Sequence, residues 1–395
     1  MKDIKKYWFI SEYYWPVENA TGHILTRLID AFTQKHEAYI ITVGNQNVGE
    51  RNKHTHTVRI KDYSSLNKNN LIQRIIKLMG LSIKMVWAVL RNVKRNDIVT
   101  TVTNPALILI FLSCVKLFKK FKLIVLVHDV FPENLVVARI IKSNSLLYKI
   151  VKVIFNFAYN RADLLIVCGR DMQTTIREKV KDKNKVIFIP NFGDTDVLYP
   201  MPKDQNPILQ NLNITDKLVI LFTGNIGRIQ DIDNIVKTAE LLSNDSSIVF
   251  LFIGTGACLD KIQNYTEKNI IWLPNMDRTE SQNFLNAGDI GLSTLLPNMM
   301  GTGVPSKTYS YMATGKPIIA VMDNDTEIAL MIQEEGNGWV VEPDNPAQLA
   351  ALLQQLKLKT DSIKEKGQIS FNLSKTKYSI EQIINQYIYT IKALQ

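Results

Sequence analysis

A serine and a lysine stand where a helix-length segment begins, within GTGVPSKTYSYMATGKPIIAV at residues 301–321. The segment stops at Gly315 and an apolar run follows at 318–321, so the pattern predicts a loop, a helix and a buried strand. Backbone N–H groups at a helix start, together with the ammonium of Lys307, suit an anion, and phosphate is the usual one. Ser306 and Lys307 therefore predict a phosphate-bearing ligand.

A second cation follows a glycine-containing loop in LFTGNIGRIQDIDNI at residues 221–235. The apolar run before the loop predicts a strand, and Gly224 and Gly227 would let a ligand approach the backbone. The guanidinium of Arg228 can clamp a phosphate with paired hydrogen bonds. The alternative is that Arg228 is a surface arginine after an ordinary turn.

A histidine and two carboxylates follow another apolar run in LIVLVHDVFPENL at residues 123–135. His128 and Asp129 stand at the predicted strand end, from which side chains reach a ligand. His128 could hydrogen-bond a ligand hydroxyl, with Asp129 or Glu133 fixing its tautomer. A histidine at a strand end is also often structural, and that alternative stays open.

The stretch YYWPVENATGHILTRLIDAF at residues 13–32 has the same order of strand end, loop and helix. Gly22 would allow a ligand to approach the backbone, and the helix after it would direct its amino end at negative charge. A plain tight turn explains this glycine equally well.

The elements that must position these residues are βα units, because short apolar runs alternate with helix-length segments. Strands are expected at 7–11, 38–43, 98–102, 123–128, 164–168 and 186–190, and again at 218–223, 248–253, 270–273, 290–294, 318–321 and 338–341. A proline-containing segment at 190–207 separates the two series. The prediction is an α/β protein with two doubly wound, Rossmann-like domains that face a cleft, since ligands of open sheets bind at the carboxyl ends of the strands. The expected domains are 1–195 and 196–375, with a helix in 376–395 that packs back on the first.

Charge is unevenly distributed over the 395 residues, whose net charge is +10. Residues 1–200 hold 31 Lys and Arg against 16 Asp and Glu, whereas residues 201–395 hold 16 against 21. In 71–95 and 116–122 the basic residues alternate with large apolar ones, which suits a helix on an anionic membrane surface. The alternative is a core-packing helix with a solvated basic face. No nucleic-acid-binding motif accompanies the charge, so we expect no nucleic-acid partner.

Localisation is predicted to be cytoplasmic, at the inner face of the cell membrane. The longest apolar run, 107–115, is shorter than the roughly 18 residues of a membrane-spanning helix. The amino-terminal sequence lacks the pattern of a signal peptide. Three scattered cysteines, Cys114, Cys168 and Cys258, indicate reduced thiols instead of a disulfide framework.

Several other motifs do not predict a site. FIGTGACL has Gly254 and Gly256 but Leu259 where a dinucleotide fingerprint needs its third glycine. Asp-x-Asp pairs occur three times without a nearby histidine or further acid at ligand spacing, so we expect no required metal or other cofactor. His54 and His56 lie in the polar stretch RNKHTHTVRI, which is expected to be a solvated loop.

With these motifs in order, the chain resembles a family 4 glycosyltransferase of the GT-B fold over nearly its whole length. The segments that carry the resemblance are the glycine loop at 13–32, HDVFPEN, IPNFGDTDVLYP, FTGNIGRIQDIDNIV, FLFIGTGACLDKI, NIIWLPNMDRTE, AGDIGLST, VPSKTYSYMATGKPIIA and GNGWVVEPDNPAQLA. The resemblance is greatest to the Pro-Ser-Lys branch, which acts in the assembly of bacterial surface polysaccharides such as capsule, O-antigen or exopolysaccharide.

The resemblance implies a retaining, metal-independent transfer of a hexosyl or N-acetylhexosaminyl group from a UDP-sugar to a lipid-diphosphate-linked glycan. Arg228 and Lys307 would serve the diphosphate, and His128 would contact the donor sugar. The catalytic set is thus His128, Arg228 and Lys307. The implied donor-binding residues are Gly22, Asn225, Gly227, Pro274, Asn275, Ser306 and Ser310, with Asp129 and Glu133 in support.

Two departures from the family pattern leave alternatives open. Asn225 and Gln230 stand where many members have Arg and Lys, and Ser310 stands where many have Glu. Arg228, Lys307 and Ser306 would then take over the phosphate contacts, or activity is lost. The alternatives are a non-catalytic subunit that binds sugar nucleotides and a GT-B-type UDP-sugar epimerase.

Overall fold

The chain folds into two compact units in the computed structural model, which describes residues 5–16, 19–61 and 71–394. The first unit comprises Met1–Ile189 and Ile384–Gln395, and the second comprises Pro190–Ile383. The division falls at the start of the proline-containing segment 190–207. The last stretch of the chain therefore belongs to the same unit as the first.

The first unit contains a seven-stranded parallel sheet in the order β3-β2-β1-β4-β5-β6-β7. Its strands are β1 (Tyr7–Ile10), β2 (Ala38–Val43), β3 (Thr55–Ile60), β4 (Ile98–Val102), β5 (Lys122–Val127), β6 (Leu164–Val167) and β7 (Val186–Phe188). The central strands are almost continuously apolar because the layers on both faces of a parallel sheet remove them from water. β1, β4 and β6 are buried along their whole length.

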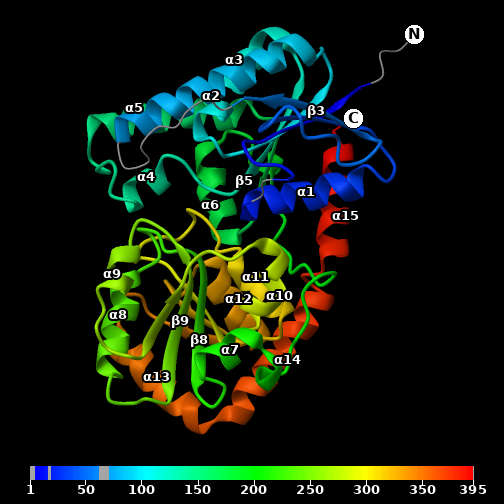
Figure 1. The fold of residues 1–395 in the computed structure, drawn as a ribbon. Coiled ribbons are helices and arrows are strands. Elements are labelled where there is room, and N and C mark those ends of the chain that lie inside the picture. The colour runs from blue at the N-terminus through cyan, green and yellow to red at the C-terminus, as the bar shows by residue number, and fades with distance from the viewer. Residues whose placement is uncertain (1–4, 17–18, 62–70, 395) are drawn as a thin grey trace. The chain divides into compact units, whose positions relative to one another are not determined.

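Helices cover this sheet. They are α1 (Ala20–Phe32), α2 (Leu71–Asn92), α3 (Ala106–Lys119), α4 (Glu133–Val137), α5 (Leu146–Arg161) and α6 (Arg170–Lys179), with α15 (Ile380–Lys392) at the chain end. Within the unit, α3 packs between α2 and α5, and the three form one layer on the side of the sheet opposite α1 (Figure 1). The part of α15 in this unit contributes the buried Tyr387 and Ile391.

The second unit contains a six-stranded parallel sheet in the order β10-β9-β8-β11-β12-β13. Its strands are β8 (Leu218–Asn225), β9 (Ile248–Thr255), β10 (Ile270–Leu273), β11 (Ile290–Thr294), β12 (Ile318–Val321) and β13 (Gly338–Val341). Its helices are α7 (Pro207–Leu212), α8 (Ile232–Leu241), α9 (Leu259–Gln263), α10 (Ser281–Leu285), α11 (Lys307–Ala313), α12 (Glu327–Glu335), α13 (Pro346–Leu358) and α14 (Thr360–Lys375). They lie on both faces of the sheet (Figure 1), and Phe222, Phe250 and Phe252 fill the core beneath α8 and α13.

The predicted fold class is confirmed, and every expected strand is present in a parallel sheet. The interpretation of His54 and His56 as part of a solvated loop is wrong in one respect, because residues from Thr55 onward form β3. Among the described strands β3 pairs with β2 alone, as an edge strand, and it mixes buried residues such as Thr55 and Arg59 with the exposed His56. The ring of His56 stacks on Tyr39 at 4.7 Å between centroids.

Candidate active site

β8 and β9 end side by side in the second unit, and glycines let their backbones approach closely. Gly224 lies opposite Gly254 in the strand register. A Cβ added to Gly254 would lie 1.9 Å from the Gly224 carbonyl oxygen, and one added to Gly256 would lie 2.3 Å from that of Ile226. Only hydrogen fits at these two positions. The site is therefore a tightly packed backbone edge at the carboxyl ends of the strands, where open parallel sheets bind ligands.

The ammonium of Lys307 is buried at this edge. Its Nζ lies 3.4 Å from the centroid of the Phe222 ring on β8 and has no hydrogen-bond partner in the described structure. Because burial removes the charge from water, it lowers the pKa of Lys307 from 10.5 to about 7. A buried cation without a hydrogen bond or a counter-ion is costly, and an anion placed beside it would recover much of that cost.

Two neighbouring strands fix α11, and hence Lys307. The hydroxyl of Tyr311 accepts a hydrogen bond from the Thr223 N–H at 2.8 Å and also lies 3.0 Å from Thr223 Oγ1 on β8. On β11, a Cβ added to Gly291 would lie 2.4 Å from the Tyr311 ring, so the glycine makes room for that ring. Tyr311 and Thr223 were not predicted as site residues. The available signal is that Tyr311 lies four residues after Lys307, one helical turn along.

Arg228 lies on the loop that follows β8, and Asn225 is the last residue of that strand; both are exposed. Asn225 folds back over the loop, so that a Cβ added to Gly227 would lie 2.5 Å from Asn225 Nδ2. No carboxylate among the described residues forms an ion pair with Arg228. Its guanidinium is thus accessible to a soluble anion, whereas Lys307 is shielded.

The other predicted donor contacts lie on adjacent segments of the same unit. Pro274 and Asn275 are exposed directly after β10, whose Trp272 donates its indole N–H to the Gly254 carbonyl at 2.9 Å. Ser306 precedes α11 and its hydroxyl caps no backbone N–H, while Ser310 lies partly buried within that helix. Pro274 and Asn275 therefore follow the strand next to β9, whereas Ser306 and Ser310 lie on the segment that carries Lys307.

Gln230 occupies an interior position in place of the lysine that the family pattern suggests. It is 8% exposed, and its side-chain Oε1 has no partner in the described structure. Its backbone carbonyl accepts a hydrogen bond from the hydroxyl of Thr294 on β11. A neutral amide at this position leaves Lys307 and Arg228 as the cations of the predicted set.

His128 lies in the first unit, directly after β5. The hydroxyl of Thr103, just beyond β4, accepts hydrogen bonds from the backbone N–H groups of His128 at 3.2 Å and Asp129 at 3.1 Å. His128 Nε2 is buried and unpartnered in the described structure. Burial lowers the pKa of His128 from 6.5 to about 4, so the imidazole is neutral at pH 7. Thr103 is a positioning residue that sequence reasoning missed.

The two carboxylates near His128 have other partners. Asp129 accepts a hydrogen bond from Asn134 at 2.8 Å, and burial raises its pKa to about 6. Glu133 pairs with the buried ammonium of Lys179 at 2.5 Å and accepts a hydrogen bond from Tyr148 at 3.2 Å. The expected hydrogen bond from the His128 ring to either carboxylate is not formed in the described structure, and Glu133 serves instead to join α4 to α6.

Gly22 is buried in the first turn of α1. Asn19 caps this helix by accepting a hydrogen bond from the Gly22 N–H at 2.8 Å. A Cβ added to Gly22 would lie 3.0 Å from the Cβ of Tyr13. Packing against Tyr13 accounts for the glycine by itself, and its contact with a donor stays a prediction.

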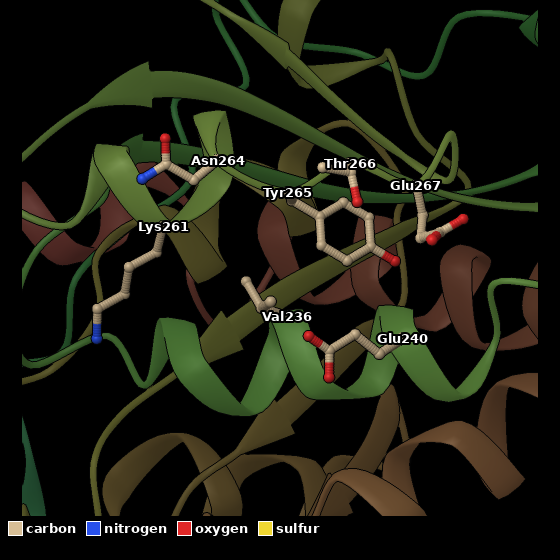
Figure 2. Close-up of a pocket in the computed structure, with 7 residues that line it drawn as sticks. All are labelled: Val236, Glu240, Lys261, Asn264, Tyr265, Thr266 and Glu267. Atoms are coloured by element: carbon tan, nitrogen blue, oxygen red, sulfur yellow. The ribbon is translucent and has the colours of Figure 1, made fainter.

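A pocket on the second unit lies away from this set of residues. It is formed between α8 and the end of α9, with Glu240, Lys261 and Tyr265 among its lining (Figure 2). None of the predicted site residues lines it. Within the described part of the chain, no three His, Cys, Asp or Glu side chains gather as a metal site would require.

Comparison with known proteins agrees with this geometry. Residues 21–197 match Glycosyltransferase Family 4, and residues 217–357 match Glycosyl transferases group 1. A probable glycosyltransferase of Pseudomonas aeruginosa, WbjE, is 37% identical over 298 residues, which cover 73% of each chain. The putative colanic acid biosynthesis glycosyl transferase WcaI of Escherichia coli is 22% identical over 59% of this chain and 58% of its own.

Solved structures show the same fold. The crystal structure of Anabaena HepE in complex with UDP and glucose aligns with a TM-score of 0.73 at 13% identity, covering 99% of this chain and 100% of that one. Sucrose-phosphate synthase from Thermosynechococcus elongatus aligns with a TM-score of 0.79 at 15% identity, covering 99% of both. The chain therefore has the GT-B fold and belongs to glycosyltransferase family 4. The family predicted from the sequence is confirmed.

Proposed function

We propose that this glycosyltransferase transfers a hexosyl or N-acetylhexosaminyl group from a UDP-sugar to a lipid-diphosphate-linked glycan, with retention at the anomeric carbon. The observation that carries the proposal is the buried, unpartnered ammonium of Lys307 above Phe222 at the carboxyl end of β8. The structure of HepE with UDP and glucose supports the choice of nucleotide.

The three predicted catalytic residues and two of the predicted donor contacts have roles in this proposal. Lys307 and the exposed Arg228 would bind the diphosphate from two sides, one shielded and one open to solvent. The backbone at Pro274 and Asn275 would meet the base. Neutral His128 would hydrogen-bond the transferred sugar. The contacts to phosphate would strengthen as the leaving group gains charge, which is the form of catalysis that fixed cations provide.

The chemical step follows from these roles. The bond from the sugar C1 to the UDP oxygen breaks, and a bond from C1 to the acceptor hydroxyl oxygen forms on the same face. The acceptor proton passes to an oxygen of the departing diphosphate. This step needs no dedicated carboxylate base. The two nearby carboxylates are bound to other residues, Asp129 to Asn134 and Glu133 to Lys179, so neither is required to take part. We propose that no metal takes part, since Lys307 and Arg228 would supply the positive charge.

A role in polysaccharide biosynthesis is supported by one relative, and the lipid-linked acceptor is our proposal. WcaI is named for colanic acid biosynthesis. We place this chain in the same kind of pathway, in which the growing glycan is carried on a lipid diphosphate. An acceptor of this kind is amphiphilic, so the enzyme would work at the cytoplasmic face of the cell membrane.

The test is UDP release by the purified protein, with a panel of UDP-hexoses and UDP-N-acetylhexosamines, with and without lipid-diphosphate acceptors. We expect acceptor-dependent release from one donor, unchanged by EDTA. Lys307→Met should remove it. Lys357→Gln is the matched control. Lys357 forms an ion pair with Asp245 at 2.8 Å and is not one of the predicted site residues.

Other outcomes would select other functions. Donor binding without release under any condition would favour a non-catalytic subunit, which the neutral residues Asn225, Gln230 and Ser310 would suit. Conversion of one UDP-sugar to its epimer without an acceptor would favour the epimerase. Either result would refute the transferase.

A further inference from the structure

Exposed apolar side chains are concentrated on one helical layer of the first unit. Among the described residues, thirteen of the twenty large apolar side chains that are exposed lie on α2, α3 and α5. Phe118 on α3 is 83% exposed and Leu146 on α5 is 73% exposed. These helices pack side by side, so their outer faces form one surface, which we call the α2-α3-α5 face (Figure 1). Contiguous exposed apolar area of this kind usually marks a binding surface.

α2 is apolar on two opposite faces. Its buried face, toward the sheet, includes Leu81, Met85 and Val89. At about 100° per residue its exposed apolar residues fall within a sector of about 80° on the opposite side. They are Ile76, Met79, Ile83, Trp87 and Leu90. A solvated helix needs only the first of these faces, so the second indicates an apolar or interfacial environment.

α5 and α3 continue this pattern. On α5 the exposed apolar residues occupy a sector of about 120°. They are Leu146, Leu147, Ile150, Val153, Ile154 and Phe157. On α3, Cys114, Leu117 and Phe118 are exposed, while Leu112 and Val115 are buried. The sequence indicated basic and apolar character at 71–95 and 116–122, whereas α5 was not predicted to take part.

The charge of this layer is of one sign. The segments 71–96, 98–128 and 140–162 contain no Asp or Glu. Exposed basic residues lie beside the apolar ones, including Lys84, Arg91, Lys149 and Lys152. Arg91 lies over the ring of Trp87, 3.2 Å from its centroid. The surface is therefore complementary to a partner that is both anionic and apolar.

We propose that the α2-α3-α5 face binds an anionic lipid bilayer, with the helices lying in the plane of the interface. The apolar side chains would enter the headgroup and acyl boundary, while the lysines and arginines would contact lipid phosphates. A second copy of this chain fits less well, because two surfaces without a single carboxylate in these segments would repel each other. Among the described residues no helix is long and apolar enough to cross a membrane, so binding would be peripheral.

This inference rests on the proposed function in one respect: membrane binding would serve to bring the enzyme to a lipid-linked acceptor. The first test is flotation of the full chain with vesicles of phosphatidylcholine, with and without phosphatidylglycerol. We expect binding only with the anionic lipid. Each of the substitutions Phe118→Glu and Ile150→Glu should weaken binding at least tenfold. Removing one charge by Lys149→Gln should weaken it about five-fold.

Leu358→Glu is the matched control. Leu358 is 81% exposed but lies at the end of α13 in the second unit, so its substitution should leave flotation unchanged. Folding of all variants is checked by their UDP affinity, which should equal that of the wild type. Flotation that is absent in the wild type, or unaffected by Phe118→Glu and Ile150→Glu, would refute the proposal. A dimer in sedimentation velocity that these two variants dissociate would assign the surface to a second copy instead.

A second readout uses a cysteine on the face itself. Cys114 is exposed, while Cys168 and Cys258 are buried, so a thiol-reactive fluorophore will label Cys114. Its emission should rise and shift to the blue with anionic vesicles, and an unchanged spectrum would count against insertion. Turnover with a water-soluble acceptor analogue is measured in parallel. If the wild-type protein binds the vesicles but shows no turnover with this analogue, the proposed function is refuted and the proposal that the α2-α3-α5 face binds membranes is retained.

Discussion

The buried ammonium of Lys307 predicts that UDP binding is coupled to proton uptake. Burial lowers its pKa from 10.5 to about 7. At about 1.4 kcal/mol for each pKa unit, this lowering corresponds to roughly 5 kcal/mol against the charged form in the ligand-free protein. A diphosphate beside Nζ favours the charged form and raises that pKa again. Above pH 7 the amine is largely neutral in the free protein, so UDP would bind together with a proton.

The affinity for UDP should therefore fall as pH rises above 7, by up to about tenfold for each pH unit. The second ionisation of a phosphate lies near pH 6, below this window. Calorimetry between pH 7 and 9 in buffers of different ionisation enthalpy counts the protons taken up. Lys307→Met should weaken UDP binding roughly 10- to 100-fold at pH 7, the usual worth of a charged hydrogen bond, and should abolish proton uptake.

The same residue predicts a pH dependence of stability without ligand. Because the folded-state pKa lies below that of the unfolded chain, the native state binds fewer protons between about pH 7 and pH 10.5. The free energy of unfolding should then rise with pH across this window, and Lys307→Met should remove the rise. UDP binding without proton uptake, or an identical pH profile in Lys307→Met, would refute the reasoning. Lys357→Gln should behave as the wild type.

Three further predictions concern positions elsewhere. The pKa of His128 is lowered to about 4, so the free energy of unfolding should fall as pH drops from 6.5 toward 4, and urea denaturation of His128→Gln should show less of this fall. The turnover of His128→Gln should be about 100-fold lower than that of the wild type, and an unchanged turnover would exclude a contact between His128 and the sugar. Lys179→Met leaves the half-buried carboxylate of Glu133 without its cation, so urea denaturation should show a loss of about 3–5 kcal/mol in the free energy of unfolding, most of it restored by adding Glu133→Gln. A full-sized loss in the double variant would mean that packing, not charge, is responsible. Gly254→Ala should abolish UDP binding in calorimetry, because the new Cβ would lie 1.9 Å from a carbonyl oxygen, whereas Gly49→Ala, with nothing within 4 Å, should bind normally.

The fold could be predicted because its strands are buried on both faces. Runs such as LVILF before Gly224 and IVFLF before Gly254 are apolar without alternation, which is typical of central parallel strands. β3 was missed because an edge strand has one open side, so THTVRI carries polar residues that also suit a loop. Its hydrogen bonds to β2, not its own composition, make it a strand.

The candidate site could be predicted in position but not in contacts. The sequence places Lys307 at a helix start and His128 at a strand end, and both are found there. It could not show that Lys307 lies over Phe222, because that contact depends on how α11 packs on β8. It also could not assign Glu133 to Lys179 instead of His128, since both partners are compatible with the local spacing.

The division of the chain into units has a consequence for synthesis on the ribosome. The second unit ends at Ile383, and the first unit is completed only by Ile384–Gln395. The first unit therefore emerges from the ribosome without Tyr387 and Ile391, whose buried side chains are added only after the whole second unit has been synthesised. During that interval the nascent first unit would expose apolar surface that these residues later cover. A stop codon just before Ile384 would keep every predicted site residue yet leave the first unit unfinished.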